Sequence, residues 1–143
     1  MGEIDELQVH SIREELESLK PIVQPFTLKL DRLGTFGEPI SPSILWAGIQ
    51  GELKALHLVY QQVEERMEKV GFSPENRSYR PHITLAKRYK GEEKFSLENS
   101  NHILYAASSA DTNDISWEAS SLILYQTHLK NTPMYEPIHS FHF

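Results

Sequence analysis

A histidine and a threonine two positions apart are the side chains of this sequence whose types and spacing suit chemistry. His82 and Thr84 lie within residues 79–87, Tyr-Arg-Pro-His-Ile-Thr-Leu-Ala-Lys. Proline disfavours helical geometry in the residue before it, so the segment that follows Pro81 is predicted to be a short strand. Alternate side chains of a strand share a face and lie roughly 6–7 Å apart at their Cα atoms. His82 and Thr84 are therefore predicted to reach one phosphate-sized group together.

The pair suits phosphoryl transfer. Histidine titrates near neutral pH and can give or take a proton. A threonine hydroxyl can donate a hydrogen bond to a phosphate oxygen as negative charge builds on it. We expect Ala86 on the same face as the pair, and Ile83 and Leu85 on the opposite face, packed against the core. The alternative is that His-x-Thr, which occurs by chance in many chains, marks a partly exposed strand face without a function.

Basic residues gather around the pair. Arg80 precedes it, and Lys87 and Arg88 follow it. Because a phosphate ligand needs positive charge, we predict that Arg80, Lys87 and Arg88 bind the substrate or its phosphate. A solvated strand end followed by a charged loop explains each of them singly. The net charge of −6 argues against broad electrostatic binding of nucleic acid, although it permits a local basic mouth.

Length and composition limit the class of protein. A chain of 143 residues, 39% hydrophobic and 24% charged, suits one globular domain. It has no cysteine, which excludes a disulfide framework, a thiolate nucleophile and a Cys-type zinc site. No apolar run reaches membrane-spanning length, and the first residues lack the basic region of a signal peptide, so no membrane association is expected. We therefore predict a cytoplasmic location.

Apolar periodicity predicts two amphipathic helices. The first has Asp5 as its N-cap and an apolar stripe that ends at Leu19, before Pro21. The second spans residues 51–70, and Gly71 stands at the position of a C-terminal cap. Strands are predicted, in chain order, at residues 25–30, 44–49, 82–86, 102–105, 115–119, 121–126 and 135–143.

The order of helices and strands predicts an α+β fold with antiparallel pairing. The apolar strand 44–49 is expected near the middle of a sheet, and residues 33–37, which contain two glycines, are expected to form a loop. Trp46 is predicted to be a core residue, with base stacking as the alternative. His10 is predicted to be a surface histidine. His139 and His142, three apart on a strand, face opposite ways and are not expected to form a metal pair.

These segments, in this order, resemble the 2H phosphoesterase superfamily. The resemblance is to its LigT-like branch of 2′-5′ RNA ligases and RNA 2′,3′-cyclic phosphodiesterases. It implies a two-lobed fold of antiparallel sheets with flanking helices, in which each lobe contributes one His-x-Thr/Ser motif to a shared cleft. One histidine then acts as general base, the other as general acid, and no metal or other cofactor is implied. The matching residues are 25–30, 44–48, 52–57, 80–86, 122–125, Tyr135 and Phe141.

Only the second motif of that family is present, as His82 and Thr84. The helix that begins after Asp5 resembles the segment that follows the first motif, so residues 1–143 are predicted to form a single LigT-like domain without the N-terminal portion that carries it. The first lobe would then be incomplete. Since acid–base assistance is worth about 10²–10⁴-fold in rate, activity is expected to be impaired. An uncovered sheet edge is also expected to cause self-association.

The sequence departs from the pattern of that family at one charged position. Lys87, followed by Arg88, stands where the family commonly has arginine, which keeps the charge but loses the bidentate fork. The leading hypothesis is a metal-independent phosphoesterase that acts on RNA 2′,3′-cyclic phosphate or 2′-5′ linkages, with RNA ends or cyclic nucleotides as partners. The alternative is a non-catalytic binder of RNA or nucleotide phosphate, and a third is a structural remnant. Hydrolysis or ligation, and the acid or base role of His82, stay open.

Overall fold

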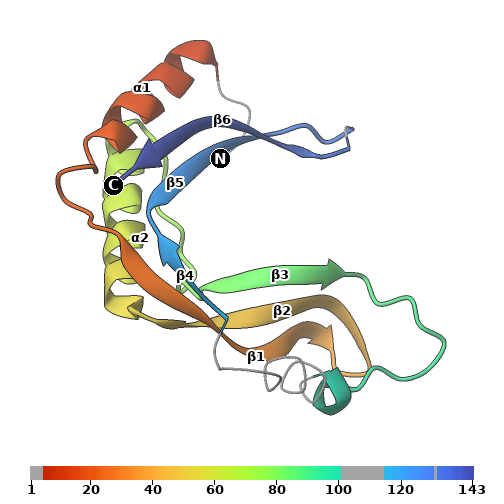
Figure 1. Cartoon of the computed structure of the whole chain (residues 1–143). Coiled ribbons are helices and arrows are strands. Elements are labelled where there is room, and N and C mark those ends of the chain that lie inside the picture. Colours follow the sequence, from red (N-terminus) through yellow and green to blue (C-terminus); the bar gives the residue numbers. More distant parts are fainter. Residues whose placement is uncertain (1–4, 101–114, 131) are drawn as a thin grey trace. The chain divides into compact units, whose positions relative to one another are not determined.

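The chain forms two compact units, each built from segments that are far apart in the sequence. The computed structural model describes residues 5–100, 115–130 and 132–143. Unit 1 comprises residues 1–26, 54–78 and 118–143, and unit 2 comprises residues 27–53 and 79–117. Both contain antiparallel strands, and the helices belong to unit 1 except for the first residue of its longer helix (Figure 1). The predicted α+β class is confirmed.

The strands form two sheets. The larger has the order β3-β2-β1-β4, and the smaller pairs β5 with β6. The sequence order of helices and strands is as predicted, except that residues 102–105 lie outside the described residues. β2, which contains the apolar run 44–49, is an inner strand of its sheet, as expected. The elements are α1 (Glu6–Glu17), β1 (Phe26–Glu38), β2 (Ser41–Gly51), α2 (Leu53–Lys69), β3 (His82–Lys87), β4 (Ser116–Ala119), β5 (Ser121–Thr127) and β6 (Tyr135–His142).

α1 begins after its predicted N-cap Asp5, and α2 ends before its predicted C-terminal glycine, Gly71. The Asp5 carboxylate accepts a hydrogen bond from the Gln8 backbone N–H at 2.8 Å, and the Gln8 side chain accepts one from the Asp5 N–H, which forms a capping box. α2 is followed by Gly71, whose φ of 93° is the left-handed conformation that glycine permits. The Phe72 N–H then donates to the Met67 carbonyl, as in a Schellman motif.

The core of unit 1 lies between its helices and its two-stranded sheet. The predicted apolar stripe of α1 is buried at Ile12 and Leu16, and Leu19 just beyond the helix is buried as well. Arg66 of α2 is only 6% exposed, and its Nε donates to Ser18 Oγ at 2.9 Å. A buried guanidinium needs such acceptors, so this bond fixes α2 against the C-terminal end of α1. Phe141 of β6 is buried too.

The predicted glycine loop at residues 33–37 is wrong, because β1 continues as a strand to Glu38. Gly34 pairs with Trp46 of β2, and a Cβ atom at Gly34 would lie 2.2 Å from the Trp46 ring. Gly37, with φ of 96°, stands where the pairing register shifts just before the turn into β2. These glycines therefore serve strand packing and a bulge, and the sequence pattern alone does not distinguish those uses from a loop.

β3 is an edge strand of the four-stranded sheet and pairs only with β2. Ile83 and Leu85, which were predicted to pack against the core, are 40% and 52% exposed. That prediction is wrong because no segment among the described residues packs over these side chains closely enough to bury them. Both faces of β3 are accessible in the part of the chain that the structure describes.

No helix among the described residues has the length and apolar character needed to cross a bilayer.

Candidate active site

His82 and Thr84 share one face of β3. Antiparallel pairing sets His82 opposite Gly48 and Thr84 opposite Trp46, two residues apart on each strand. Side chains opposite each other across a sheet point to the same face, so His82, Thr84 and Trp46 belong to one surface. Both members of the pair are exposed. The strand therefore presents an imidazole and a hydroxyl to solvent.

A bulge at Leu85 changes the alternation of side chains after Thr84. Trp46 pairs with Thr84 and its neighbour Leu45 pairs with Ala86, so Leu85 is an extra residue on β3. Because an extra residue reverses which face the following residues take, Ala86 shares the face of Leu45. The expectation that Ala86 lies on the same face as Thr84 is wrong for this reason.

The same bulge brings Lys87 to the face of Thr84. Lys87 pairs with Ile44, which lies two residues from Trp46 on β2 and so shares its face. Along the strand Lys87 lies about 10 Å from Thr84 and about 16 Å from His82 at a rise of roughly 3.3 Å per residue. Thr84 is thus within closer reach of the ammonium group than His82. The sequence signal for the bulge is weak, since no glycine marks it.

The His82 ring is held by a backbone carbonyl. Its Nδ1 lies 2.7 Å from the carbonyl oxygen of Arg80. A carbonyl oxygen only accepts hydrogen bonds, so Nδ1 must carry the hydrogen and Nε2 is left as the other ring nitrogen. This contact orients the ring through a group without net charge, and it leaves Nε2 for proton transfer. Arg80 therefore contributes through its backbone, a role that its side-chain type did not predict.

Two aromatic rings lie beside the imidazole. The Phe36 ring meets His82 edge-on at 5.6 Å between centroids, and the Trp46 ring lies 6.3 Å away. Phe36 and Trp46 also contact each other at 5.4 Å. Trp46 Nε1 is buried and has no hydrogen-bond partner among the described residues. Trp46 is thus a half-buried neighbour of the site rather than only a core residue.

Phe36 was missed by sequence reasoning because the segment around it was expected to be a loop. Its alternation with Gly34 on a strand that pairs with Trp46 is the signal that could have found it.

The three basic residues predicted to bind phosphate differ in position. Arg80 precedes β3, Lys87 ends it, and Arg88 follows with φ of 59°, where its N–H donates to the Ser43 carbonyl at 2.7 Å. All three are exposed. The described residues contain no cluster of three or more His, Cys, Asp or Glu side chains arranged to hold a metal ion.

The fold and the site define an α+β protein that presents a His-x-Thr pair on the edge strand of an antiparallel sheet. The family described as AKAP7 2′5′ RNA ligase-like domain matches residues 3–143 of this chain. The chain belongs to this family, the LigT-like branch of the 2H phosphoesterases, as the resemblance in the sequence predicted.

Curated relatives match nearly the whole chain. It is 33% identical over 141 residues to an RNA 2′,3′-cyclic phosphodiesterase of Geobacillus stearothermophilus, covering 99% of this chain and 42% of that protein. It is 28% identical over 141 residues to an RNA 2′,3′-cyclic phosphodiesterase of Bacillus subtilis, covering 99% of this chain and 72% of that protein. The chain thus spans less than half of the first of these relatives.

Solved structures share the fold at lower identity. One is E. coli LigT in complex with 3′-AMP, with a TM-score of 0.70 and 16% identity, matched over 100% of this chain and 72% of that one. Another is TT0787 of Thermus thermophilus, with a TM-score of 0.72 and 19% identity, matched over 99% of this chain and 73% of that one. These matches confirm the predicted LigT-like α+β architecture.

Proposed function

We propose that this chain is a metal-independent phosphoesterase, or the part of one, that acts on RNA 2′,3′-cyclic phosphate ends or 2′-5′ linkages. The observation that carries the proposal is the exposed His82 imidazole, held at Nδ1 by the Arg80 carbonyl with Nε2 left for proton transfer. Its family membership and the names of its relatives support the same chemistry.

Hydrolysis of a cyclic phosphate needs two proton transfers. The water oxygen forms a bond to phosphorus, and the bond from phosphorus to one ribose oxygen breaks. A base takes the proton from water, and an acid gives one to the leaving oxygen. His82 Nε2 serves one of these transfers. In the neutral ring Nε2 carries a lone pair, which suits the base, and after protonation the same nitrogen suits the acid.

Thr84 and the basic residues hold the phosphate in this proposal. The Thr84 hydroxyl donates to a non-bridging oxygen, where negative charge grows in the transition state. Lys87, on the Thr84 face, attracts the same group or the next phosphate along an RNA chain. Arg80 and Arg88 add positive charge at the two ends of the strand. Each contact favours an anionic ligand over the neutral sugar.

We propose further that the second proton-transfer group is lacking from residues 1–143. The printed sequence contains His-x-Thr once, and the family reaction implied by the resemblance uses two such motifs. A domain without the portion that carries the first motif would turn over its substrate about 10²–10⁴-fold more slowly than a domain with both motifs. Reading the coding DNA upstream of Met1 tests this, because an in-frame His-x-Thr/Ser is expected there. Full activity from the printed chain alone would contradict it.

The test of the activity is turnover of a 2′,3′-cyclic nucleotide to a nucleotide phosphomonoester by the full chain. His82→Ala is expected to lower kcat by about 10²–10⁴-fold, since it removes the proton-transfer group. His142→Ala, which replaces an exposed histidine of unit 1, is the matched control and should leave kcat unchanged. Equal rates for wild type and His82→Ala would reject the proposal.

The second candidate function is non-catalytic binding of RNA or nucleotide phosphate. It is favoured by the position of Lys87 on the face of Thr84, which suits binding even without a second histidine. Under this alternative, a 2′,3′-cyclic nucleotide binds saturably, no product forms, and Lys87→Ala weakens binding whereas His82→Ala does not. Turnover that depends on His82 would exclude it.

We also propose that the chain self-associates through the small sheet. β5 and β6 pair only with each other among the described residues, so each has a free edge. Ile123, Tyr125 and Tyr135 on these strands are exposed apolar side chains. Light scattering should therefore show a mass that rises with protein concentration, and a constant monomer mass would contradict this. The cytoplasmic location stays a prediction that cell fractionation can test.

A further inference from the structure

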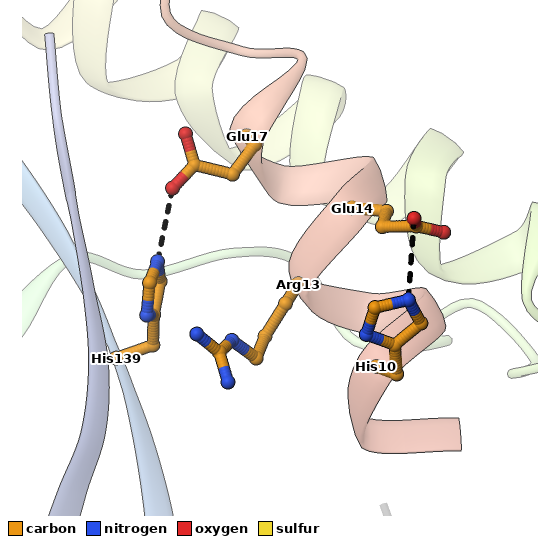
Figure 2. A pocket seen from close by; sticks show the side chains of 5 residues that line it. All are labelled: His10, Arg13, Glu14, Glu17 and His139. Carbon is orange, nitrogen blue, oxygen red and sulfur yellow. Dashed lines mark hydrogen bonds and ion pairs between the residues drawn. The ribbon is translucent and has the colours of Figure 1, made fainter. Parts of the chain in front are cut away.

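A charged pocket lies in unit 1, apart from the residues assigned to the proposed activity. It is an open pocket of about 540 Å³ between α1 and β6, and its lining consists of His10, Arg13, Glu14, Glu17 and His139. The α1 members are spaced by three and four residues, so they form one polar stripe beside the buried stripe of that helix. Figure 2 shows these side chains projecting into the same space.

Each imidazole of the pocket is held by a glutamate. His139 Nε2 lies 2.9 Å from Glu17 Oε1, and His10 Nε2 lies 3.2 Å from Glu14 Oε1. Both contacts use Nε2, so Nδ1 of each ring is left for another partner. Glu17 is also paired with Lys20. Both carboxylates of the pocket are therefore already paired with imidazoles or a cation.

Arg13 is the charged group of the pocket that has no protein partner. Within the described ranges, its guanidinium forms no hydrogen bond or ion pair. Figure 2 shows it extending from α1 towards β6, with the rings of His139 and His10 on either side. A guanidinium has five N–H donors in a planar fork that matches the oxygens of phosphate or carboxylate. Arg13 therefore presents an unused anion-binding fork between two imidazoles.

We propose that this pocket binds a tetrahedral oxyanion, such as the phosphate group of a phosphomonoester, through Arg13, with Nδ1 of His10 and of His139 as further donors once each ring is protonated. The charged groups that line the pocket are Arg13, Glu14 and Glu17, and Lys20 outside the lining is paired with Glu17. The two histidines can add positive charge to this set. When both histidines are neutral, the positive charges of Arg13 and Lys20 balance the negative charges of Glu14 and Glu17. Each proton that a histidine takes up then adds one positive charge. Histidine gains its proton between about pH 5 and pH 8, so binding strengthens as pH falls through that range.

Sulfate is the suitable probe, because it stays a dianion across this range and any pH dependence then belongs to the protein. Titration of the full chain with sodium sulfate, followed by NMR amide shifts, should show saturable changes at α1 and β6. The dissociation constant should be at least threefold lower at pH 6 than at pH 8. Inorganic phosphate and a nucleoside 5′-monophosphate in separate arms distinguish a free anion site from one that prefers a phosphomonoester.

Arg13→Gln should raise the sulfate dissociation constant at least tenfold, while Arg77→Gln, an exposed arginine of unit 1 outside the pocket, should leave it unchanged. Arg13→Lys keeps the charge without the fork, and its intermediate affinity is expected even where Arg13→Gln folds poorly. His82→Ala should not affect sulfate binding at α1 and β6, so failure here and failure of the phosphoesterase proposal are distinguishable. No saturable shift at α1 and β6, or equal affinity in wild type and Arg13→Gln, would overturn the site.

Discussion

The histidine of β3 and the histidines of the α1–β6 pocket are held in opposite ways. His82 donates through Nδ1 to a backbone carbonyl, at 2.7 Å from the Arg80 oxygen. His139 and His10 meet carboxylates through Nε2. A carbonyl orients a ring without adding charge, whereas a carboxylate forms an ion pair once the ring is protonated. The same residue type is therefore oriented by a backbone carbonyl in unit 2 and paired with carboxylates in unit 1.

The side chains around these histidines also differ in polarity. Phe36 and Trp46 lie against His82, whereas the pocket of unit 1 is lined by charged side chains. Apolar rings restrict the imidazole on one side, while glutamates accept hydrogen bonds from it. The comparison teaches that the neighbours of a histidine, more than its presence, indicate which chemistry it can perform.

After His82→Ala, Thr84→Val is expected to give the largest effect among the changes that test the β3 side of this comparison. Valine keeps the shape of threonine and removes the hydroxyl that donates to phosphate, so kcat should fall by about 10²–10³-fold. Thr84→Ser restores a hydroxyl and should recover most of the rate. Steady-state turnover of a 2′,3′-cyclic nucleotide measures both. A Thr84→Val rate within twofold of wild type would remove the hydroxyl from the mechanism.

Gly34→Ala tests whether the aromatic neighbours position His82. The added Cβ would meet Trp46 ring atoms at 2.2–2.6 Å, so the ring must move, at a cost of about 1–3 kcal/mol in the free energy of unfolding. Turnover should fall as well, because the displaced ring contacts His82. Urea unfolding and turnover report the two effects.

Gly71→Ala is the matched control for that change. Gly71, unlike Gly34, has a positive φ that favours glycine, and nothing lies within 4 Å of its added Cβ. It should lower the free energy of unfolding without changing the turnover of the folded protein. Unchanged stability and turnover in Gly34→Ala would contradict the packing account.

Lys87→Ala tests the face assignment that follows from the bulge at Leu85. Loss of a charged contact to phosphate should cost about 1.5 kcal/mol, which is roughly a tenfold rise in KM, with a small change in kcat. Lys90→Ala, beyond the end of β3, is the matched control and should have little effect. The KM values of the two variants, measured at low ionic strength, show whether Lys87 contacts the substrate. Equal KM in both variants would place Lys87 away from the substrate.

Glu17→Gln tests the unit 1 side of the comparison, and its effect, on stability, is expected to be the smallest. The hydrogen bonds from Lys20 and then from His139 hold the pKa of the Glu17 carboxyl below its ordinary value of 4.5. A lowered pKa in the folded state stabilises the fold above the unfolded value, and this contribution is lost as pH falls through the folded value. Wild type should thus be slightly more stable than Glu17→Gln at pH 7, and the difference should be smaller at pH 3, where more of the Glu17 carboxyl is protonated.

Urea midpoints at the two pH values measure this difference, with Glu92→Gln, an exposed carboxylate after β3, as the control. A difference between wild type and Glu17→Gln that is unchanged or larger at pH 3 would contradict the assignment.

Local patterns predicted the helices and the site strand, because their signals lie close together in the chain. The predicted N-cap at Asp5 and the predicted C-terminal glycine at position 71 are both confirmed. The contact between Glu17 and His139 joins residues 122 positions apart, and nothing in either local pattern marks it. The exposure of Ile83 likewise depends on which distant segments pack over β3, and its local pattern does not mark this.

The sequence predicted only the part of the candidate site that depends on neighbouring residues. The His-x-Thr spacing on a strand indicated that His82 and Thr84 share a face, and the register agrees. The bulge that turns Lys87 to that face depends on pairing with β2, and the ring of Phe36 reaches His82 only because β1 remains a strand beyond Gly34. Such features arise from how strands align, which residue types alone do not determine.

The tautomer of His82 tests the central claim most directly. Two-dimensional NMR that correlates the ring nitrogens with ring protons distinguishes a protonated Nδ1 from a protonated Nε2 in the neutral imidazole. At a pH where the ring is neutral, His82 should carry its hydrogen on Nδ1, opposite the Arg80 carbonyl, with Nε2 unprotonated. His139 should carry its hydrogen on Nε2, opposite Glu17. A neutral His82 protonated at Nε2 would contradict the account, because the lone pair needed for proton transfer would then be on the nitrogen that faces the carbonyl.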